Sequence, residues 1–460
     1  MNHPWVSLRR HFGLLAAMGA ATVLIAAGLN SQAGVFFPGA ARNNVGGVMV
    51  DAQGVVRNPD RQALKELQKV RQDFLKEIPA ELRDETKLRR VSLKKILAAA
   101  AANMKDKAGV LPDDVRFLGG LQRIQYVLVY PELKDIVLVG PAEGWKIADT
   151  GEPVGITTGH PVMQFDDLVV ALRTAAGPRR EPITCSIDPT TEGIKKLHAY
   201  LDTQPVMTAR NKARILGQAE NELGMQKVTL TGIDPTSRFA RVLVAADYRM
   251  KRLAMGFDPA PIKGMPSYMQ MASAERQQNL MPRWWLEDDY QPLRTDDQGL
   301  AWEIRGQGVQ CKTEDEIIGA DGSRRGTGKQ DPVASKWAKT MTDKYNELSA
   351  QEPVFGQLRN CMDLAVVAAL IVSEDLAKKA DLDLGDVLKD PMFMPDQYEQ
   401  ARELPTLANA LEKNRRWLIS ASGGVSLDPW RAAKKREKSD KLAPVRDDSL
   451  PPAGATWWWN

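Results

Sequence analysis

Two cysteines and two histidines are the residues of this chain that could perform nucleophilic catalysis. A thiol enzyme needs a cysteine whose proton is taken by a histidine, and a third group that orients the imidazole. Cys185 or Cys361, with His160 or His198, could supply the first two groups if folding brings them together. Cys185 lies inside an apolar run and Cys361 precedes another, so we expect both thiols to be packed and inert. A pair of carboxylates acting in hydrolysis is left open, because nothing in a sequence fixes their separation.

Metal-dependent chemistry is not expected. The chain has four histidines, of which only His160 and His198 follow residue 33. A structural zinc site needs about four close nitrogen or sulfur ligands, and the three cysteines form no Cys-x-x-Cys pair. Acidic pairs such as Asp166-Asp167 lack the spacing of a calcium loop. We therefore expect neither a metal nor another cofactor.

A basic, glycine-rich segment at 321–329 superficially suggests a phosphate-binding loop. The register fails, because Ser323 stands where the first glycine should be and Gln330 replaces the magnesium-binding hydroxyl. One interpretation is a solvated basic turn. The other is an anion-binding loop in which Arg324 and Arg325 donate bidentate hydrogen bonds to a sulfated or phosphorylated polymer.

Two groups of adjacent tryptophans are candidate binding residues. Trp284 and Trp285 begin a predicted strand, so their rings face opposite sides, one towards the core and one towards a possible binding face. Trp457, Trp458 and Trp459 end the chain after a basic, proline-containing segment. They could anchor the protein to a partner or a membrane interface. A frayed terminus, or one that folds back onto its own body, is the alternative.

The N-terminal segment predicts export. Arg9 and Arg10 precede an uncharged stretch at 12–29, and Ser31-Gln32-Ala33 follows as a small-x-small exit. This order is typical of a signal peptide, here residues 1–33. A retained membrane anchor and a twin-arginine signal are the alternatives. The sequence thus predicts a periplasmic, extracellular or envelope-associated protein that touches a membrane only through this segment, if it is uncleaved.

Charge and length set further limits. The net charge is +4, and removing residues 1–33 takes away Arg9, Arg10 and no acid, which leaves +2. This balance offers no basic stripe for nucleic acid, so we expect no nucleic-acid partner. A chain of 460 residues predicts two or three domains.

Periodicity predicts an α/β or α+β fold, with mixed sheets and packed helices. Helices are expected at 93–104, 165–175, 238–255, 333–349 and 355–378, strands at 124–130, 135–139, 183–187 and 227–231, and a meander over 283–311. The expected organisation is a signal peptide at 1–33, an extended lead-in plus helical unit at 34–115, an α/β domain at 116–234, a third domain at 235–430 and a disordered tail at 431–460.

Several short motifs in the third region occur together. They are Ala-Asp-Tyr-Arg-Met-Lys-Arg at 246–252, Met-Gly at 255–256, Gly-Met-Pro-Ser-Tyr at 264–268, Gly-Gln-Gly-Val-Gln-Cys at 306–311 and Phe-Gly-Gln-Leu-Arg-Asn at 355–360. As a set they resemble an uncharacterised family of bacterial exported proteins defined by a domain of unknown function, of the 1598 type. The resemblance covers residues 118–429 and is strongest at 242–370. It implies export and supplies no catalytic residue.

Together these patterns predict an exported, non-catalytic binding or scaffolding module of the periplasm or cell envelope. Its partner would be an envelope protein or a polysaccharide. A secreted hydrolase that uses a thiol or carboxylates is one alternative, and a polyanion binder is the other.

Overall fold

The computed structural model describes residues 44–59, 61–106, 111–205, 207–208, 210–274, 282–319, 323–406, 408–409, 411–413, 416–418 and 422–460. The predicted signal peptide at 1–33 lies outside these residues. The described part is a mixed α/β structure, as predicted, with helices packed on and between two large sheets.

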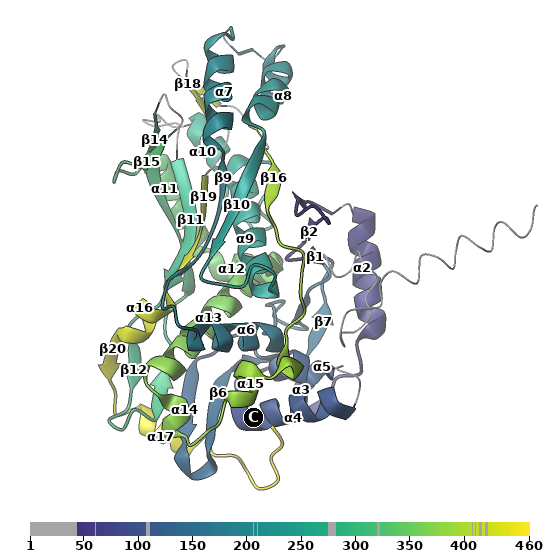
Figure 1. Ribbon diagram of the computed structural model, residues 1–460, viewed down its shortest axis with the longest axis vertical. Coiled ribbons are helices and arrows are strands. Elements are labelled where there is room, and N and C mark those ends of the chain that lie inside the picture. The colour runs from purple at the N-terminus through teal and green to yellow at the C-terminus, as the bar shows by residue number, and fades with distance from the viewer. Residues whose placement is uncertain are drawn as a thin grey trace, which may run out of the picture.

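The first large sheet, which we call the upper sheet, occupies the upper half of the molecule (Figure 1). Its seven strands run in the order β15 (Arg324–Gly326), β14 (Gly308–Ile318), β11 (Pro282–Asp289), β19 (Ser422–Leu427), β9 (Ile183–Pro189), β10 (Met225–Thr231) and β16 (Glu403–Pro405). Most neighbours are antiparallel, but β11 and β19 are parallel.

The second large sheet, the lower sheet, also has seven strands. They are, in order, β20 (Arg436–Lys438), β12 (Leu293–Thr295), β13 (Ala301–Glu303), β5 (Tyr126–Tyr130), β6 (Asp135–Ala142), β4 (Thr86–Ser92) and β21 (Trp458–Trp459). The predicted hairpin is confirmed, because β5 and β6 pair antiparallel with Tyr130 opposite Asp135. Lys134 closes its turn in the left-handed conformation, with φ of 52°.

Three smaller sheets complete the strands. One is built from β1 (Asn44–Val45), β2 (Val48–Val50) and β3 (Val56–Arg57), another from β7 (Trp145–Ile147) and β8 (Pro153–Gly155), and the third from β17 (Leu411–Lys413) and β18 (Arg416–Leu418).

Eight helices of the described residues are longer than seven residues, and those predicted at 93–104, 165–175 and 238–255 are confirmed. The eight are α2 (Arg61–Phe74), α4 (Leu93–Asp106), α6 (Phe165–Ala176), α7 (Thr191–Asp202), α8 (Lys212–Leu223), α9 (Arg238–Met255), α11 (Pro332–Asp343) and α13 (Pro353–Ser373). Shorter helices are α3 (Ala80–Arg83), α5 (Asp113–Arg116), α10 (Tyr268–Ala274), α12 (Tyr345–Gln351), α14 (Leu376–Lys379), α15 (Gly385–Lys389), α16 (Pro429–Lys434) and α17 (Leu442–Asp447).

Helix α13 lies at the centre, between the two sheets (Figure 1). It is the one helix of the described residues that is long and apolar enough to cross a membrane, yet it is wholly buried inside the protein. It contacts α6, α16, α12 and α9, so it is covered by helices from several parts of the chain. Such all-round burial is typical of the core helix of a large domain.

Two predicted helices are interrupted. The helix expected at 333–349 is divided into α11 and α12 at Lys344, where the backbone leaves the helical region. The helix expected at 355–378 ends at Ser373, and Asp375 adopts a left-handed conformation with φ of 52° before α14. Aspartate tolerates this conformation better than most residues, and no glycine or proline marks the break in the sequence.

The expected meander at 283–311 is wrong in its pairing. The chain leaves the upper sheet after β11, adds β12 and β13 to the lower sheet, and returns to the upper sheet as β14. A local pattern does not reveal which sheet a strand joins. The expected boundary at residue 235 therefore does not separate the sheets, since β9 and β10 share the upper sheet with β11, β14 and β19.

Two adjacent glycines, Gly423 and Gly424, lie within β19. Gly423 has φ of +150°, and a Cβ atom built on it would lie 1.4 Å from the carbonyl oxygen of Trp284. The neighbouring strand β11 approaches too closely for any side chain, so glycine is required here by contact as well as by conformation.

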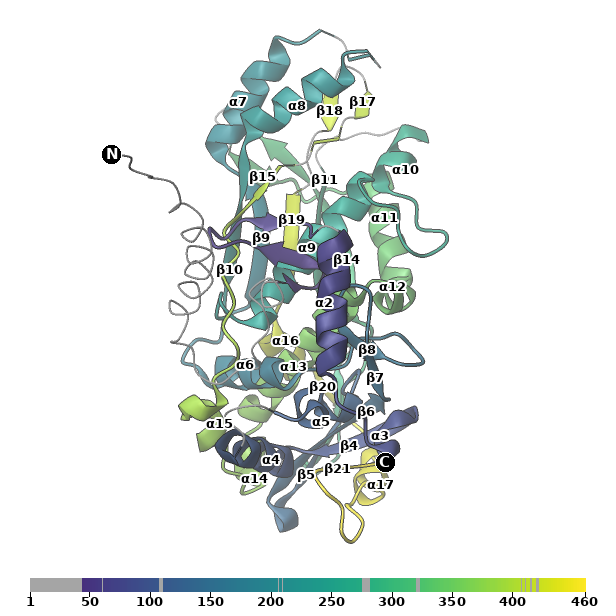
Figure 2. The same ribbon diagram turned by 90° about the vertical axis from the view of Figure 1, so that its right-hand side faces the viewer.

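The prediction that residues 431–460 form a disordered tail is wrong. After α16 this segment adds β20 to one edge of the lower sheet and β21 to the other. Trp458 and Trp459 pair with Val91 and Arg90 of β4, and the C-terminus lies beside α3 (Figure 2). The polar composition had suggested that the tail buries too little to order itself, but sheet pairing and three large rings supply what is needed.

Substituting Trp459 tests this docking. Trp459 is 6% exposed and packs with Leu128 and Tyr130. Trp459→Ala should lower the free energy of unfolding by about 3–5 kcal/mol, because it leaves a cavity against the lower sheet. Urea unfolding measures the change, with Leu450→Ala as control, since Leu450 is 47% exposed. A loss no greater than the control's, about 0.5 kcal/mol, would show that the ring is not packed there.

Candidate functional site

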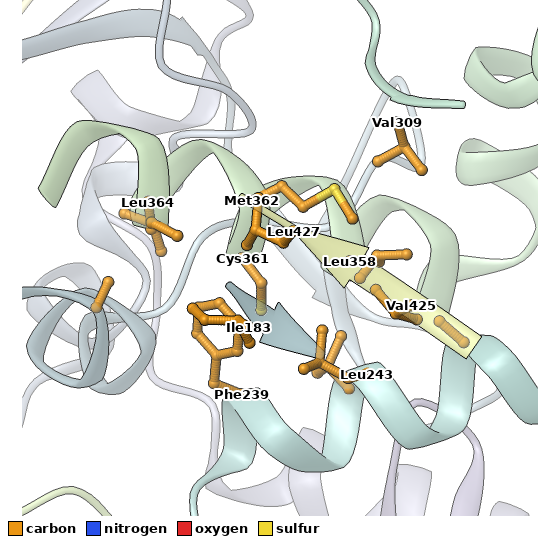
Figure 3. Close-up of a cluster of buried hydrophobic side chains, with 14 of the residues drawn as sticks. Ile183, Phe239, Leu243, Val309, Leu358, Cys361, Met362, Leu364, Val425 and Leu427 are labelled. Carbon is orange, nitrogen blue, oxygen red and sulfur yellow. The ribbon is translucent and has the colours of Figure 1, made fainter. Parts of the chain in front are cut away.

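The thiols considered as catalytic candidates are packed in the core. Cys185 on β9 and Cys361 on α13 are buried, and Figure 3 shows Cys361 among apolar side chains that include Ile183 and Phe239. Burial raises the pKa of both thiols well above its usual value, and the nearby carboxylate of Asp167 adds to the effect at Cys361. Burial likewise raises the pKa of Cys311. The thiolate, which is the nucleophile, is therefore disfavoured at all three positions.

The histidines do not join these thiols. His160 Nδ1 lies 3.1 Å from Ser349 Oγ at the end of α12, and His198 lies on α7. No hydrogen bond connects a thiol with a histidine ring anywhere in the part of the chain that the structure describes. Nor do the described His, Cys, Asp and Glu side chains form a group of three that could hold a metal ion.

The two candidate anion-binding arginines differ in their contacts and exposure. Arg324 donates to Asp188 at 2.7 Å and to Glu316 at 2.6 Å, so its guanidinium is occupied by two carboxylates of this chain. Arg325 is exposed. The structure thus leaves Arg325 on the surface and commits Arg324 to joining β15, β9 and β14.

The two candidate tryptophans at the start of β11 lie on opposite faces of the strand. Trp284 is fully buried, with its ring 4.7 Å from Tyr268 and 5.4 Å from Trp337 in edge-to-face arrangements. Trp285 faces the other side of β11, where its indole nitrogen donates to Glu287 at 2.9 Å and Arg283 covers its ring. Trp284 is therefore the core member of the pair.

The three terminal tryptophans rest on the protein itself. The backbone N–H of Ser92 donates to the Trp457 carbonyl at 2.8 Å, and the Arg89 guanidinium lies 5.4 Å from the ring centre of Trp458. Arg89 also donates to the side-chain oxygen of Asn460 at 2.9 Å. In this structure the segment folds back onto its own body, which was the alternative to an anchor.

A different group of residues stands out, on the buried helix α13. Its apolar sequence is interrupted by Gln357, Arg359, Asn360 and Asp363, and each bonds to another segment of the chain. Gln357 donates to Glu152 at 2.5 Å, and Asn360 donates to the Pro161 carbonyl at 2.9 Å. Buried polar groups of this kind are normally fully hydrogen-bonded, so the exceptions among them are informative.

The carboxylate of Asp363 accepts hydrogen bonds at both of its oxygens. Arg123, which precedes β5, grips its two oxygens at 2.7 and 3.0 Å. The hydroxyl of Tyr290 donates to it at 2.7 Å and the backbone N–H of Ile124 at 3.3 Å. A bidentate guanidinium and two further donors stabilise this buried carboxylate, which connects α13 to the lower sheet.

The guanidinium of Arg359 leaves most of its hydrogen-bond donors unused. Arg359 is 4% exposed, and among the described residues it makes one hydrogen bond, from Nη1 to Asn346 Oδ1 at 2.9 Å. Its Nε is buried without a partner. Burial, followed by the charge of Arg123, lowers the pKa of Arg359 to about 10. Even so, the guanidinium stays charged at neutral pH.

His160 approaches the same place from a loop. Glu143 holds this loop by accepting from the backbone N–H of Thr157 at 2.7 Å and of Thr158 at 3.0 Å. Burial, together with the charges of Arg359 and Arg123 and against the opposing effect of Glu143, lowers the pKa of His160 to about 4. The ring is consequently neutral at pH 7.

We call Arg123, His160, Arg359 and Asp363 the arginine cluster. At neutral pH it holds two positive guanidinium groups, one carboxylate and one neutral imidazole, so it has a surplus of one positive charge. Glu143 acts on His160 but is not among the charges that shift the pKa of Arg359. The surplus lies on Arg359, the member of the cluster with most of its donors free.

Of this cluster, sequence reasoning singled out only His160. A signal was nevertheless present, since Arg359 and Asp363 interrupt an otherwise apolar run one helical turn apart. Arg123 could not be connected to them, because it lies 240 residues away from Asp363.

Comparison with known families identifies one region of the chain. Residues 185–268 match the family described as Protein of unknown function (DUF1598). We call this matched region the DUF1598 domain. It spans β9 to the start of α10 and contains the predicted motifs at 246–256 and 264–268. The match is shorter than the expected 118–429, and the motifs at 306–311 and 355–360 lie outside it. No curated protein and no solved structure gave a significant match.

Within the DUF1598 domain, the charged residues of the 246–252 motif hold α9 in place. Lys251 pairs with Asp247 at 2.9 Å and donates to the carbonyl of Ile187 on β9 at 2.7 Å. Arg252 binds Asp258 just after the helix at 2.6 Å, and Arg249 binds both Asp258 and Glu352. The motif thus has a structural role, and the arginine cluster lies outside the DUF1598 domain.

Two substitutions distinguish a structural from a functional arginine. Arg123→Met removes the guanidinium from the buried carboxylate of Asp363 and should cost about 3–5 kcal/mol of unfolding free energy. Arg359→Met removes a buried charge that forms no salt bridge with a carboxylate of the described residues, so stability should be unchanged or increased. Urea unfolding of both variants gives the comparison, and an equal loss in the two would make Arg359 a structural residue.

His160 should give a pH-dependent stability. Its pKa in the folded state, about 4, lies below the ordinary value of 6.5, so the unfolded chain binds more protons between these values. Stability should therefore rise from pH 4 to pH 6.5, by at most about 3 kcal/mol. Urea unfolding at several pH values should show a smaller rise for His160→Gln. Equal slopes for the variant and the unaltered protein would contradict the assignment.

Proposed function

We propose that the chain is an exported, non-catalytic binding or scaffolding protein of the periplasm or cell envelope. The burial of all three thiols, with the pKa of each raised, is the observation that carries the non-catalytic part. The leader pattern at 1–33 supports export. The contacts of Arg324 with Asp188 and Glu316 argue against a polyanion binder that depends on this residue.

A carboxylate-based hydrolase is the second candidate, and one observation favours it. Burial, followed by the charge of Asp396, raises the pKa of Asp166 to about 7. The backbone N–H of Asp396 lies 3.5 Å from the Asp166 carboxyl group. An acid that titrates near neutral pH beside a second carboxylate is a combination that hydrolases use.

Two measurements test the proposal. Mass spectrometry of the secreted or periplasmic protein should find a mature N-terminus at Gly34, whereas an intact Met1 on cytosolic protein would refute export. The purified protein should show no turnover on peptide, ester and glycan substrates. Turnover that is lost in Asp166→Asn, and retained in Asp297→Asn as a surface control, would replace the proposal with the hydrolase.

Thiol reactivity gives a further prediction. Because the three cysteines are buried and their thiolates disfavoured, the native protein should react with Ellman's reagent far more slowly than free glutathione does. In denaturant all three thiols should react at once. One native thiol that reacts faster than glutathione would restore a thiol enzyme to consideration.

A further inference from the structure

Arg359 binds less than three other buried or half-buried arginines of the described chain. Arg123 is paired bidentately with Asp363, and Arg238 lies between Asp167 and Glu152. Arg89 has no carboxylate partner, but it makes three hydrogen bonds and covers the ring of Trp458. Arg359 has one amide oxygen. A guanidinium carries five N–H donors, so most of its hydrogen-bonding capacity is unused.

A glycine lets the backbone pass close to the side chain of Arg359. Gly308, with φ of +91°, would place a Cβ atom 3.0 Å from Arg359 Cγ and 3.2 Å from Arg123 Nη2. Both guanidinium side chains therefore pass close to the same backbone position. Gly308 belongs to the motif at 306–311 and Arg359 to the motif at 355–360, so two of the predicted motifs meet here.

The guanidinium is also close to the surface. Its partner Asn346 is exposed, while Ser349 beside His160 is buried. A ligand that reached Arg359 past Asn346 would meet the unused donors of the guanidinium and the polar edge of α12. The His160 ring, which is neutral, would not repel it.

We propose that Arg359 is the binding residue for a carboxylate group of a small ligand. The inference rests on the proposed binding function and names the chemistry of its ligand. The surplus of one positive charge in the arginine cluster matches one carboxylate, whereas a phosphate dianion would reverse the charge. A planar guanidinium matches the two oxygens of a carboxylate in a bidentate pair.

Acetate is the probe for this site. At matched ionic strength, acetate in place of chloride should raise the melting temperature of the full mature protein by about 2 °C or more. The signal of ¹³C-labelled acetate should broaden in its presence. Arg359→Met should abolish both effects. Arg359→Lys should weaken binding about tenfold, because lysine keeps the charge but cannot form the bidentate pair of hydrogen bonds. Arg325→Met, an exposed arginine outside the cluster, should leave both effects unchanged.

Further arms identify the source of the carboxylate. A dipeptide with a free C-terminus, compared with its C-terminal amide, distinguishes the end of a peptide chain from a free acid. No binding of either acetate or the free dipeptide to the unaltered protein would overturn the site, as would acetate binding that survives Arg359→Met. These results leave the export and turnover tests unaffected, so failure of the site and failure of the proposed function can be told apart.

Discussion

Helix α13 must be covered by protein on every side, and this need organises the molecule. Exposing any face of this largely apolar helix of 21 residues to water would cost free energy, so other elements have to surround it. The chain meets this need with α6, α9, α12 and α16, which come from distant parts of the sequence. The two sheets are built on either side of this centre.

The polar residues of α13 decide how the covering elements are placed. An apolar surface is satisfied by many packings, but a buried carboxylate or amide has few acceptable partners. Asp363 fixes the lower sheet through Arg123, Asn360 fixes the loop at Pro161, and Gln357 fixes Glu152. Each bond excludes arrangements in which its donor or acceptor would be buried alone. Arg359 is the charged member of the series that has no oppositely charged partner, and for that reason it is the one we assign to a ligand.

Buried and half-buried charged contacts also hold the DUF1598 domain together. Its charged motif residues join α9 to β9, to the segment at Asp258 and to the start of α13 at Glu352. Asp247 is fully buried, and burial raises its pKa to about 6, against the opposing effect of its partner Lys251. These contacts explain the charged residues of the motif by their role in holding the fold together. The residues that we connect with binding lie outside the DUF1598 domain, because Arg359 and Gly308 belong to later motifs and His160 to an earlier loop.

Local periodicity was enough to predict much of the secondary structure of this protein. The helix at 238–255 matches α9, with Ser237 as its cap, and the hairpin at 124–139 matches β5 and β6. Spacing along one segment determines such elements, because a helix or hairpin forms mostly from neighbours in sequence. Burial of the cysteines could be expected for the same reason, from the apolar runs around them.

The tertiary structure alone decided which sheet β13 joins, that the tail docks on β4, and that Arg123 meets Asp363 across 240 residues. Pairing of this kind depends on which distant surfaces become buried together, and no residue carries that information by itself. The same holds for the free donors of Arg359. Whether a buried charge is compensated depends on every group around it, and those groups are assembled only by the complete fold.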